Sequence, residues 1–502
     1  MNTLETAATH QKMPDLEVKT GLGSVLGKNA GQGVRVFKGI PYAAPPTGSR
    51  RWEPPQAVEG WGGVREARAF APDCPQTIDV GSRASCQDED CLYLNIWSPS
   101  GARPGRLPVM VWIHGGSYVS GSGSEARLDG TRLAAEGVVV VTFNYRLGIF
   151  GFLAHPQLTE ASPHQSSSNY ALLDQIAAFN WVKQHIAAFG GDPERITAFG
   201  VSAGSASISL LLASPLGGGL FDRAILESPG ACRRLASLEE AEQAGLSLAP
   251  EIDTLRQMSA AEVLALTPKL APPVRGLTTP RVLRPIRDGW VIPEEESEVF
   301  NALRMHKMPL IVGVNADEGT QATASWPVST VSDYNLLLQT SFGTQAEQAK
   351  QVYPVSEDDD VREKVAELFA DTQFNHGSRL LSRCMTSAGK PVWNYVFTRR
   401  RSYQNDGPHH GQEVHYVFGN LLAPYPGEQP VADDTDKALS QAMVAAWVSF
   451  AREAVPLLPS GLNWPAICQN NMPYMEWGDV PQVAMNWRQQ QLDFMERYFS
   501  QK

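Results

Sequence analysis

The chain of 502 residues lacks the marks of several large protein classes. Its formal net charge is −11, and no Lys/Arg cluster resembles the basic patch of a nucleic-acid-binding protein, so we expect no nucleic-acid partner. No apolar run approaches the length of a membrane span. No C-x-x-C pair or Cys/His cluster occurs, which argues against a zinc site. Internal repeats and low-complexity tracts are also absent, and the composition that remains is that of a globular protein.

The first residues are polar and contain no hydrophobic core of a signal peptide. We predict a loose tail over residues 1–16, in either a cytoplasmic protein or the mature form of an exported one. Six cysteines are present, of which Cys74 and Cys91 flank a polar loop. A disulfide could close this loop, and reduced thiols are the alternative.

Predicted strands and helices alternate along most of the chain. Short alternating patterns between Val18 and Asn95 predict β-strands, and the later continuous apolar runs suit a sheet covered on both faces. These runs predict strands at 108–113, 137–144, 196–199, 223–226, 309–314 and 392–397, with helices at 171–188 and 203–213. The alternation indicates an α/β fold with a mostly parallel sheet. We predict one domain over 17–502, with helical insertions near 237–298 and 327–387.

The most informative segment is the pentapeptide Gly200-Val201-Ser202-Ala203-Gly204, between a predicted strand and a predicted helix. A G-x-S-x-G sequence alone is weak evidence. In a strand–turn–helix setting it is typical of a nucleophile elbow, a tight turn that lifts the serine hydroxyl clear of the sheet. Ser202 is therefore a candidate nucleophile.

An activated serine needs an oxyanion hole, an acid and a base. His114-Gly115-Gly116-Ser117 follows a buried strand, where backbone N–H groups can point into a site. Glu318 and Asp317 are the candidate acids beyond the strand at 309–314. The candidate bases are His410 and its competitors His409 and His415. The order serine, acid, histidine is the order found in α/β-hydrolases.

Long ordered segments of the chain resemble type-B carboxylesterases, the family that includes cholinesterases and bacterial para-nitrobenzyl esterases. The segments are FKGIPYAAPPTGSRRW (37–52), EDCLYLNIWSP (89–99), NYRLGIFGFL (144–153), NYALLDQIAAFNWVKQHIAAFGGDP (169–193), GVNADEG (313–319) and HGQEVHYVFG (410–419). The resemblance runs from about residue 18 to the C-terminus. It implies the α/β-hydrolase fold and hydrolysis of a small-molecule carboxylic ester, without a cofactor or metal.

Matched position by position, the resemblance implies Ser202 as nucleophile, Glu318 as acid and His410 as base. Backbone N–H groups of Gly116, Ser117 and Ala203 are the implied oxyanion donors. The family also keeps structural ion pairs at the positions of Arg51 with Glu89 and Arg146 with Asp174, and a disulfide at the positions of Cys74 and Cys91.

The chain departs from the family pattern beside the nucleophile and in the oxyanion loop. Ser117 stands where a third glycine is usual, and Val201 stands where the family commonly has Glu. Tyr118, Val201, Arg233 and Arg234 are candidate substrate-binding residues.

Arginine pairs bidentately with carboxylates, so Arg233 and Arg234 favour an ester whose acyl part carries carboxylates. Residues 227–246 also resemble, more weakly, the fumonisin-esterase branch, which cleaves tricarballylate esters. A generalist esterase of short aliphatic or aryl esters is the alternative, and a non-catalytic scaffold of the same fold is a remote one.

Overall fold

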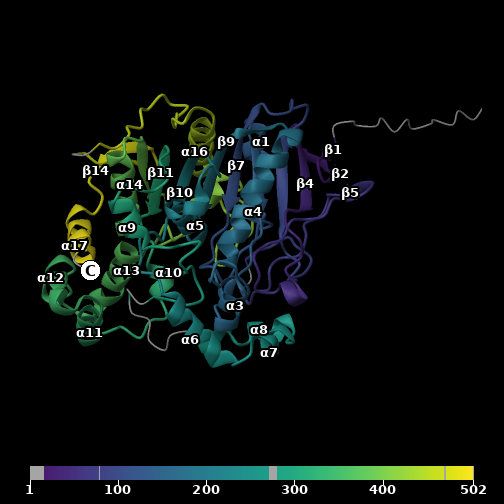
Figure 1. The fold of residues 1–502 in the computed structure, drawn as a ribbon. Helices are drawn as coiled ribbons and strands as arrows, with labels where there is room; N and C mark the ends of the chain where they lie inside the picture. Colours follow the sequence, from purple (N-terminus) through teal and green to yellow (C-terminus); the bar gives the residue numbers. More distant parts are fainter. Residues whose placement is uncertain (1–15, 79, 271–276, 278–279, 469–470, 501–502) are drawn as a thin grey trace, which may run out of the picture.

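The computed structural model describes residues 16–78, 80–270, 277, 280–468 and 471–500. Most of the tail predicted at 1–16 lies outside them. Among the described residues an eleven-stranded sheet forms the centre of the molecule (Figure 1). Its strands, in spatial order, are β14 (Gln482–Met485), β13 (Pro473–Trp477), β12 (Val392–Phe397), β11 (Leu310–Asn315), β10 (Arg223–Glu227), β9 (Gly191–Val201), β7 (Leu107–Ile113), β8 (Val139–Phe143), β6 (Tyr93–Pro99), β4 (Val34–Pro41) and β3 (Lys28–Gly31).

The strands from β13 to β8 run parallel, and the strands at both edges run antiparallel. β7 and β8 are buried along almost their whole length, as expected of strands covered on both faces. The six strands predicted from apolar runs are confirmed, with small changes at their ends. A separate small sheet contains β1 (Glu17–Thr20), β2 (Gly23–Leu26) and β5 (Val64–Glu66).

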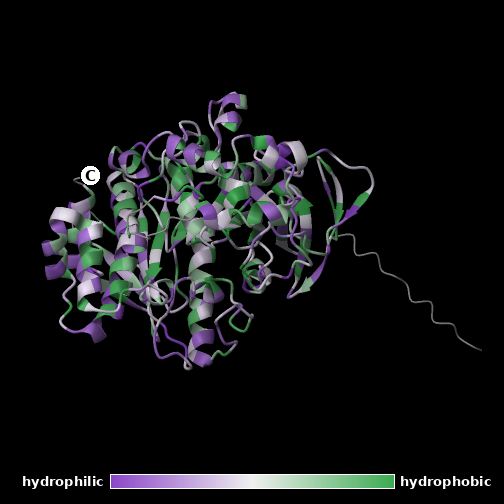
Figure 2. Ribbon diagram, turned by 90° about the horizontal axis from the view of Figure 1, so that it is seen from below, coloured by the Kyte–Doolittle hydropathy of each residue, from purple (hydrophilic) through white to green (hydrophobic). Residues whose placement is uncertain are grey.

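Helices cover both faces of the sheet and bury two large apolar clusters against it. The helices α4 (Tyr170–His185), α5 (Ala203–Ala213) and α14 (His376–Ser387) pack on one face, and α1 (Thr131–Ala135), α15 (Val414–Val417) and α16 (Asp434–Glu453) on the other. Hydrophobic segments run through the middle of the ribbon, while the outer helices carry both hydrophilic and hydrophobic residues (Figure 2). No helix of the described residues combines the length and apolarity that a membrane span requires.

The ranges 237–298 and 327–387, where the sequence predicts insertions, contain several helices in the structure. The first contains α6 (Leu238–Leu248), α7 (Ile252–Arg256), α8 (Ala260–Leu264) and α9 (Glu296–Asn301). The second contains α11 (Val331–Phe342), α12 (Ala346–Val352), α13 (Val361–Ala370), a π-helix at Asp371–Asn375, and α14. In Figure 1, α6–α8 lie at the bottom and α11–α13 at the lower left, beside the C-terminal α17 (Gln489–Phe499). Short helices α2 (Gly148–Phe152), α3 (Pro156–Ala161) and α10 (Thr320–Thr323) complete the set.

Two buried ion pairs tie the loops around the sheet together, as the sequence resemblance implied. Arg146 follows β8 and makes two hydrogen bonds, of 2.8 and 2.7 Å, to Asp174 on α4. Their side chains are 3% and 0% exposed. Arg51 pairs with Glu89 at 2.5 Å and donates to backbone carbonyls of the first insertion.

Cys74 and Cys91 are both buried and carry free thiols in this structure. A hydrogen bond between the two side chains and burial together raise the pKa of the Cys91 thiol well above its ordinary value. The reduced alternative is therefore the one that the structure contains.

The first testable prediction concerns the ion pair of Arg146 with Asp174. Arg146→Ala would leave the Asp174 carboxylate buried without its partner, which typically costs about 3–5 kcal/mol of unfolding free energy. We expect a loss of that size in urea unfolding. Arg304 pairs with Glu294 at 2.5 Å, but both side chains are about half exposed, so Arg304→Ala is a matched control that should cost far less than Arg146→Ala, because water solvates the remaining charge. Equal losses in the two variants would contradict the structural role assigned to the buried pair.

Candidate active site

Ser202 lies in the turn between β9 and α5, at the end of the sheet where the parallel strands finish. Its backbone has φ +56° and ψ −119°, a combination that costs a non-glycine residue about 1–3 kcal/mol. The Ser202 N–H donates to the Glu227 carbonyl at 2.9 Å, which fixes the turn to the end of β10. A Cβ at Gly204 would collide with the backbone oxygen of Ile113 on β7, so glycine is required for α5 to lie this close to the sheet.

Glu318 and His410 lie together near this turn, although 92 positions separate them in the sequence. Glu318 follows β11 and is buried, and its Oε2 atom contacts the Nδ1 atom of His410. The other oxygen, Oε1, accepts hydrogen bonds from the Asn315 N–H at 2.6 Å and the Ser228 hydroxyl at 2.5 Å. The carboxylate is thus held on both oxygens and orients the imidazole.

The competing residues occupy different places. His409 pairs with Asp317 at 3.3 Å and with Asp406 at 3.2 Å, so the two rivals of the candidate acid and base form a pair of their own. His415 is fully buried, close to the carbonyl of Ala423, and burial lowers its pKa well below the ordinary value. Geometry therefore separates His410 from both of its neighbours.

The electrostatics around His410 favour its cationic form. Burial lowers the pKa of His410, but the negative charge and hydrogen bond of Glu318 outweigh it and hold the pKa above the ordinary value. Glu413, three residues further along the loop, is fully buried. Burial, together with the charge of Glu318, raises its pKa to about 7. Its Oε2 atom accepts a hydrogen bond of 2.6 Å from Asn315.

A cavity of about 240 Å³ lies beside Ser202. Its lining residues are Ser117, Tyr118, Ser202, Ala203, Gly230, Arg233, Arg281, Arg284, Ala322, Trp326, Phe369, Gln373 and Phe374. The Phe374 ring stacks on the imidazole of His410, with centroids 4.5 Å apart. Phe374 and Ser202 both line the cavity, so the ring of Phe374 connects His410 to the space beside Ser202.

The predicted oxyanion residues are adjacent to the serine. Gly116, Ser117 and Tyr118 all have positive φ, at +104°, +57° and +65°, which turns the chain sharply after β7. A Cβ placed on Gly115 would lie 3.2 Å from that of Ser202, so this loop passes directly beside the turn. Ser117 and Ala203 both line the cavity.

The candidate substrate-binding residues divide into two groups. Tyr118 and Arg233 line the cavity of Ser202. Arg234 is exposed and lines an adjoining hollow, and Val201 is buried near Gly411.

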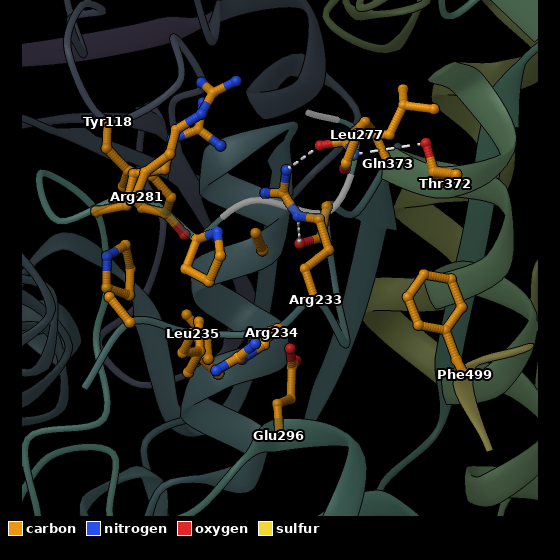
Figure 3. Close-up of a pocket in the computed structure, with 17 residues that line it drawn as sticks. Tyr118, Arg233, Arg234, Leu235, Leu277, Arg281, Glu296, Thr372, Gln373 and Phe499 are labelled. Atoms are coloured by element: carbon orange, nitrogen blue, oxygen red, sulfur yellow. Dashed lines mark hydrogen bonds between the residues drawn. The ribbon is translucent and has the colours of Figure 1, made fainter. Parts of the chain in front are cut away.

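Figure 3 shows the adjoining hollow, which shares Tyr118, Arg233 and two further arginines with the cavity. It contains Glu296, the one acidic residue among the described residues that line it, and burial raises the pKa of Glu296 to about 7.

Sequence reasoning missed Arg281, Arg284, Gln373 and Phe374. The two arginines stand three residues apart in a segment rich in proline, 280–285. That spacing carries no periodic signal for the direction of the side chains. Gln373 and Phe374 belong to the π-helix, which a helical pattern in the sequence does not distinguish from ordinary α-helix.

The profile of the carboxylesterase family matches residues 14–495. The chain belongs to the carboxylesterase family. It is 45% identical to a fumonisin B1 esterase of Sphingopyxis macrogoltabida, over 90% of this chain and 84% of that protein. It is 36% identical to the para-nitrobenzyl esterase of Bacillus subtilis (strain 168), over 89% of this chain and 92% of that protein. A solved structure of a PNB esterase, 33% identical, superposes with a TM-score of 0.85 over 95% of this chain and 99% of the other.

This carboxylesterase is therefore a hydrolase of carboxylic esters with the α/β-hydrolase fold, and its substrate is a small-molecule ester. The fold and the activity implied by the sequence resemblance are confirmed.

Proposed function

We propose that Ser202, Glu318 and His410 form the catalytic triad. His410 accepts the Ser202 proton as the hydroxyl oxygen attacks the ester carbonyl, and Glu318 orients the imidazole and stabilises its cation. The alcohol leaves with a proton from His410, and an acyl group remains on Ser202. Water then attacks the acyl-enzyme with His410 as base, which releases the acid and restores the serine.

Backbone N–H groups of Gly116, Ser117 and Ala203 are the proposed donors to the oxyanion. Each such donor typically lowers the barrier by about 3–4 kcal/mol. The positive φ of Ser117 supports this assignment, because it gives the residue the backbone turn that a glycine provides elsewhere in the family. The serine side chain narrows the cavity without removing the N–H donor.

The substrate that the site supports best is an ester whose acyl part carries free carboxylates. The observation behind this proposal is that Arg233, Arg281 and Arg284 line the same cavity as Ser202. The chain as a whole has a net charge of −11, so three guanidinium groups at one cavity run against its overall charge. Such a cavity attracts an anionic ligand and pairs with its carboxylates.

The similarity to a fumonisin B1 esterase supports the same substrate class. Tricarballylate esters, with two free carboxylates on the acyl group, are the specific substrates we propose. The second candidate is a generalist esterase of short neutral esters. The apolar wall formed by Trp326, Phe369 and Phe374, and the similarity to para-nitrobenzyl esterase, favour it.

Ser202→Ala tests the nucleophile. It should lower kcat by about 10⁴-fold or more on every ester, because all hydrolysis passes through the serine. The measurement is release of free acid from 4-nitrophenyl butyrate and from a tricarballylate ester, with circular dichroism to verify folding. A folded variant that retained activity would exclude Ser202 as the nucleophile.

The pH dependence of kcat/KM tests the base. Only neutral His410 accepts the serine proton, so activity should fall with decreasing pH around an apparent pKa above 6.5, the ordinary value for His. In Glu318→Gln the negative charge that raises the pKa of His410 is gone, while the burial that lowers this pKa remains. The acid limb should then move to lower pH, with reduced kcat. A limb at the same pH in both enzymes would contradict the pairing of Glu318 with His410.

Arg233→Ala tests the substrate class. The matched substrates are the 4-nitrophenyl hemisuccinate and butyrate esters, which differ in a terminal carboxylate. Loss of a charge-assisted pair should reduce the ratio of kcat/KM for hemisuccinate over butyrate about tenfold. Arg234→Ala, at the exposed neighbouring position, is the matched control and should leave the ratio within about twofold. Unchanged ratios in both variants would favour the generalist candidate.

A further inference from the structure

Gln373 connects Arg233 to a rigid part of the protein. The Nη1 atom of Arg233 donates to the Oε1 atom of Gln373 at 2.7 Å, and the Nε atom donates to the Gly230 carbonyl at 2.9 Å. The amide nitrogen of Gln373 donates in turn to the Leu277 carbonyl at 2.7 Å. Figure 3 shows the Arg233 guanidinium bonded to Gln373, beside Leu277.

Two of the three guanidinium nitrogens of Arg233 bond to residues that the structure describes. Nε and Nη1 of Arg233 are engaged, and no hydrogen bond from the described residues is found at Nη2. Gln373 is 8% exposed, so its amide is desolvated and its hydrogen bond to Arg233 competes little with water. The guanidinium is fixed in direction, and a fixed donor loses less entropy when it binds a carboxylate.

The π-helix that carries Gln373 is itself firmly anchored. Asp371, which is fully buried, accepts hydrogen bonds from Arg488 at 2.8 Å, Tyr353 at 2.7 Å and Asn375 at 2.7 Å. Downstream, a Cβ at Gly377 would collide with the carbonyl oxygen of Ala231. The start of α14 therefore packs backbone against backbone on the turn that leads to Arg233.

We propose that Gln373 is a positioning residue for substrate specificity, which holds the Arg233 guanidinium toward the acyl group of an anionic ester. This inference rests on the proposed substrate class. Gln373 touches Arg233 and acts on the substrate through it. The neutral amide is essential to the role, because a carboxylate at this position would pair with Arg233 and cancel its charge.

Two variants test the proposal, with the hemisuccinate and butyrate esters as substrates. Gln373→Glu should lower the hemisuccinate-to-butyrate ratio of kcat/KM about tenfold, mainly through a higher KM for hemisuccinate. Gln373→Met keeps the length of the side chain without the hydrogen bond, and its ratio should fall about threefold. A merely structural role would lower activity on both esters equally.

A double-mutant cycle identifies Arg233 as the group through which Gln373 acts. In the Arg233→Ala background, Gln373→Met should change the ratio no further, because the guanidinium that Gln373 positions is already absent. Additive losses would overturn the proposal. In an enzyme that prefers hemisuccinate, so would a ratio for Gln373→Glu within twofold of that of the unmodified enzyme.

Inhibition by free tricarballylate separates failure of this inference from failure of the proposed substrate class. With butyrate ester as substrate, the inhibition constant of tricarballylate should rise about tenfold in Gln373→Glu. If the unmodified enzyme shows no preference for hemisuccinate, the proposed substrate class fails. A raised inhibition constant would then still support the role of Gln373, and an unchanged one would overturn it.

Discussion

The site depends on the strained turn at Ser202, which its surroundings must hold in place. A non-glycine residue at φ +56° and ψ −119° is costly by itself. The cost is met by tight packing, because α5 lies against β7 where Gly204 passes the Ile113 carbonyl, and the Ser202 N–H is bonded to β10. The whole of α5 up to Leu212 is buried. A serine hydroxyl presented at a fixed point is therefore a consequence of the packing of the sheet.

The other groups of the proposed triad lie at the same edge of the sheet. Parallel strands all end on one side, and Ser202, Ser228 and Asn315 follow or end the strands β9, β10 and β11. Ser228 and Asn315 both bond to Glu318, so neighbouring strand ends position the acid that orients His410. The ends of neighbouring parallel strands therefore fix the positions of both Ser202 and Glu318.

Much of this could be predicted from the sequence, for a physical reason. Buried strands such as β7 and β8 are marked by runs of β-branched and apolar residues, and the elbow at Ser202 by glycines at fixed offsets. The choice of His410 over His409 needed the family pattern, because local sequence contains no sign that His409 turns to Asp317.

Of the three arginines that line the cavity, only Arg233 could be predicted from the sequence. The sequence indicated Arg233 and Arg234 equally, because nothing in the local sequence distinguishes two adjacent arginines. In the fold, Arg233 lines the cavity of Ser202 and Arg234 is exposed. Arg281 and Arg284 belong to a segment without hydrophobic periodicity. Packing against distant parts of the chain sets the path of this segment. Gln373 could not be found at all, because its role depends on the register of a π-helix.

The register of the π-helix also explains how the consecutive residues Gln373 and Phe374 contact two different groups. Successive side chains on a helix point roughly a quarter of a turn apart. Gln373 can therefore face Arg233, while Phe374 lies flat on the imidazole of His410. One short segment, fixed through Asp371, contacts both the group proposed to recognise the acyl chain and the proposed base. A shift of this π-helix would move both contacts at once, so the recognition of substrate charge that we propose and the orientation of the histidine depend on the same segment.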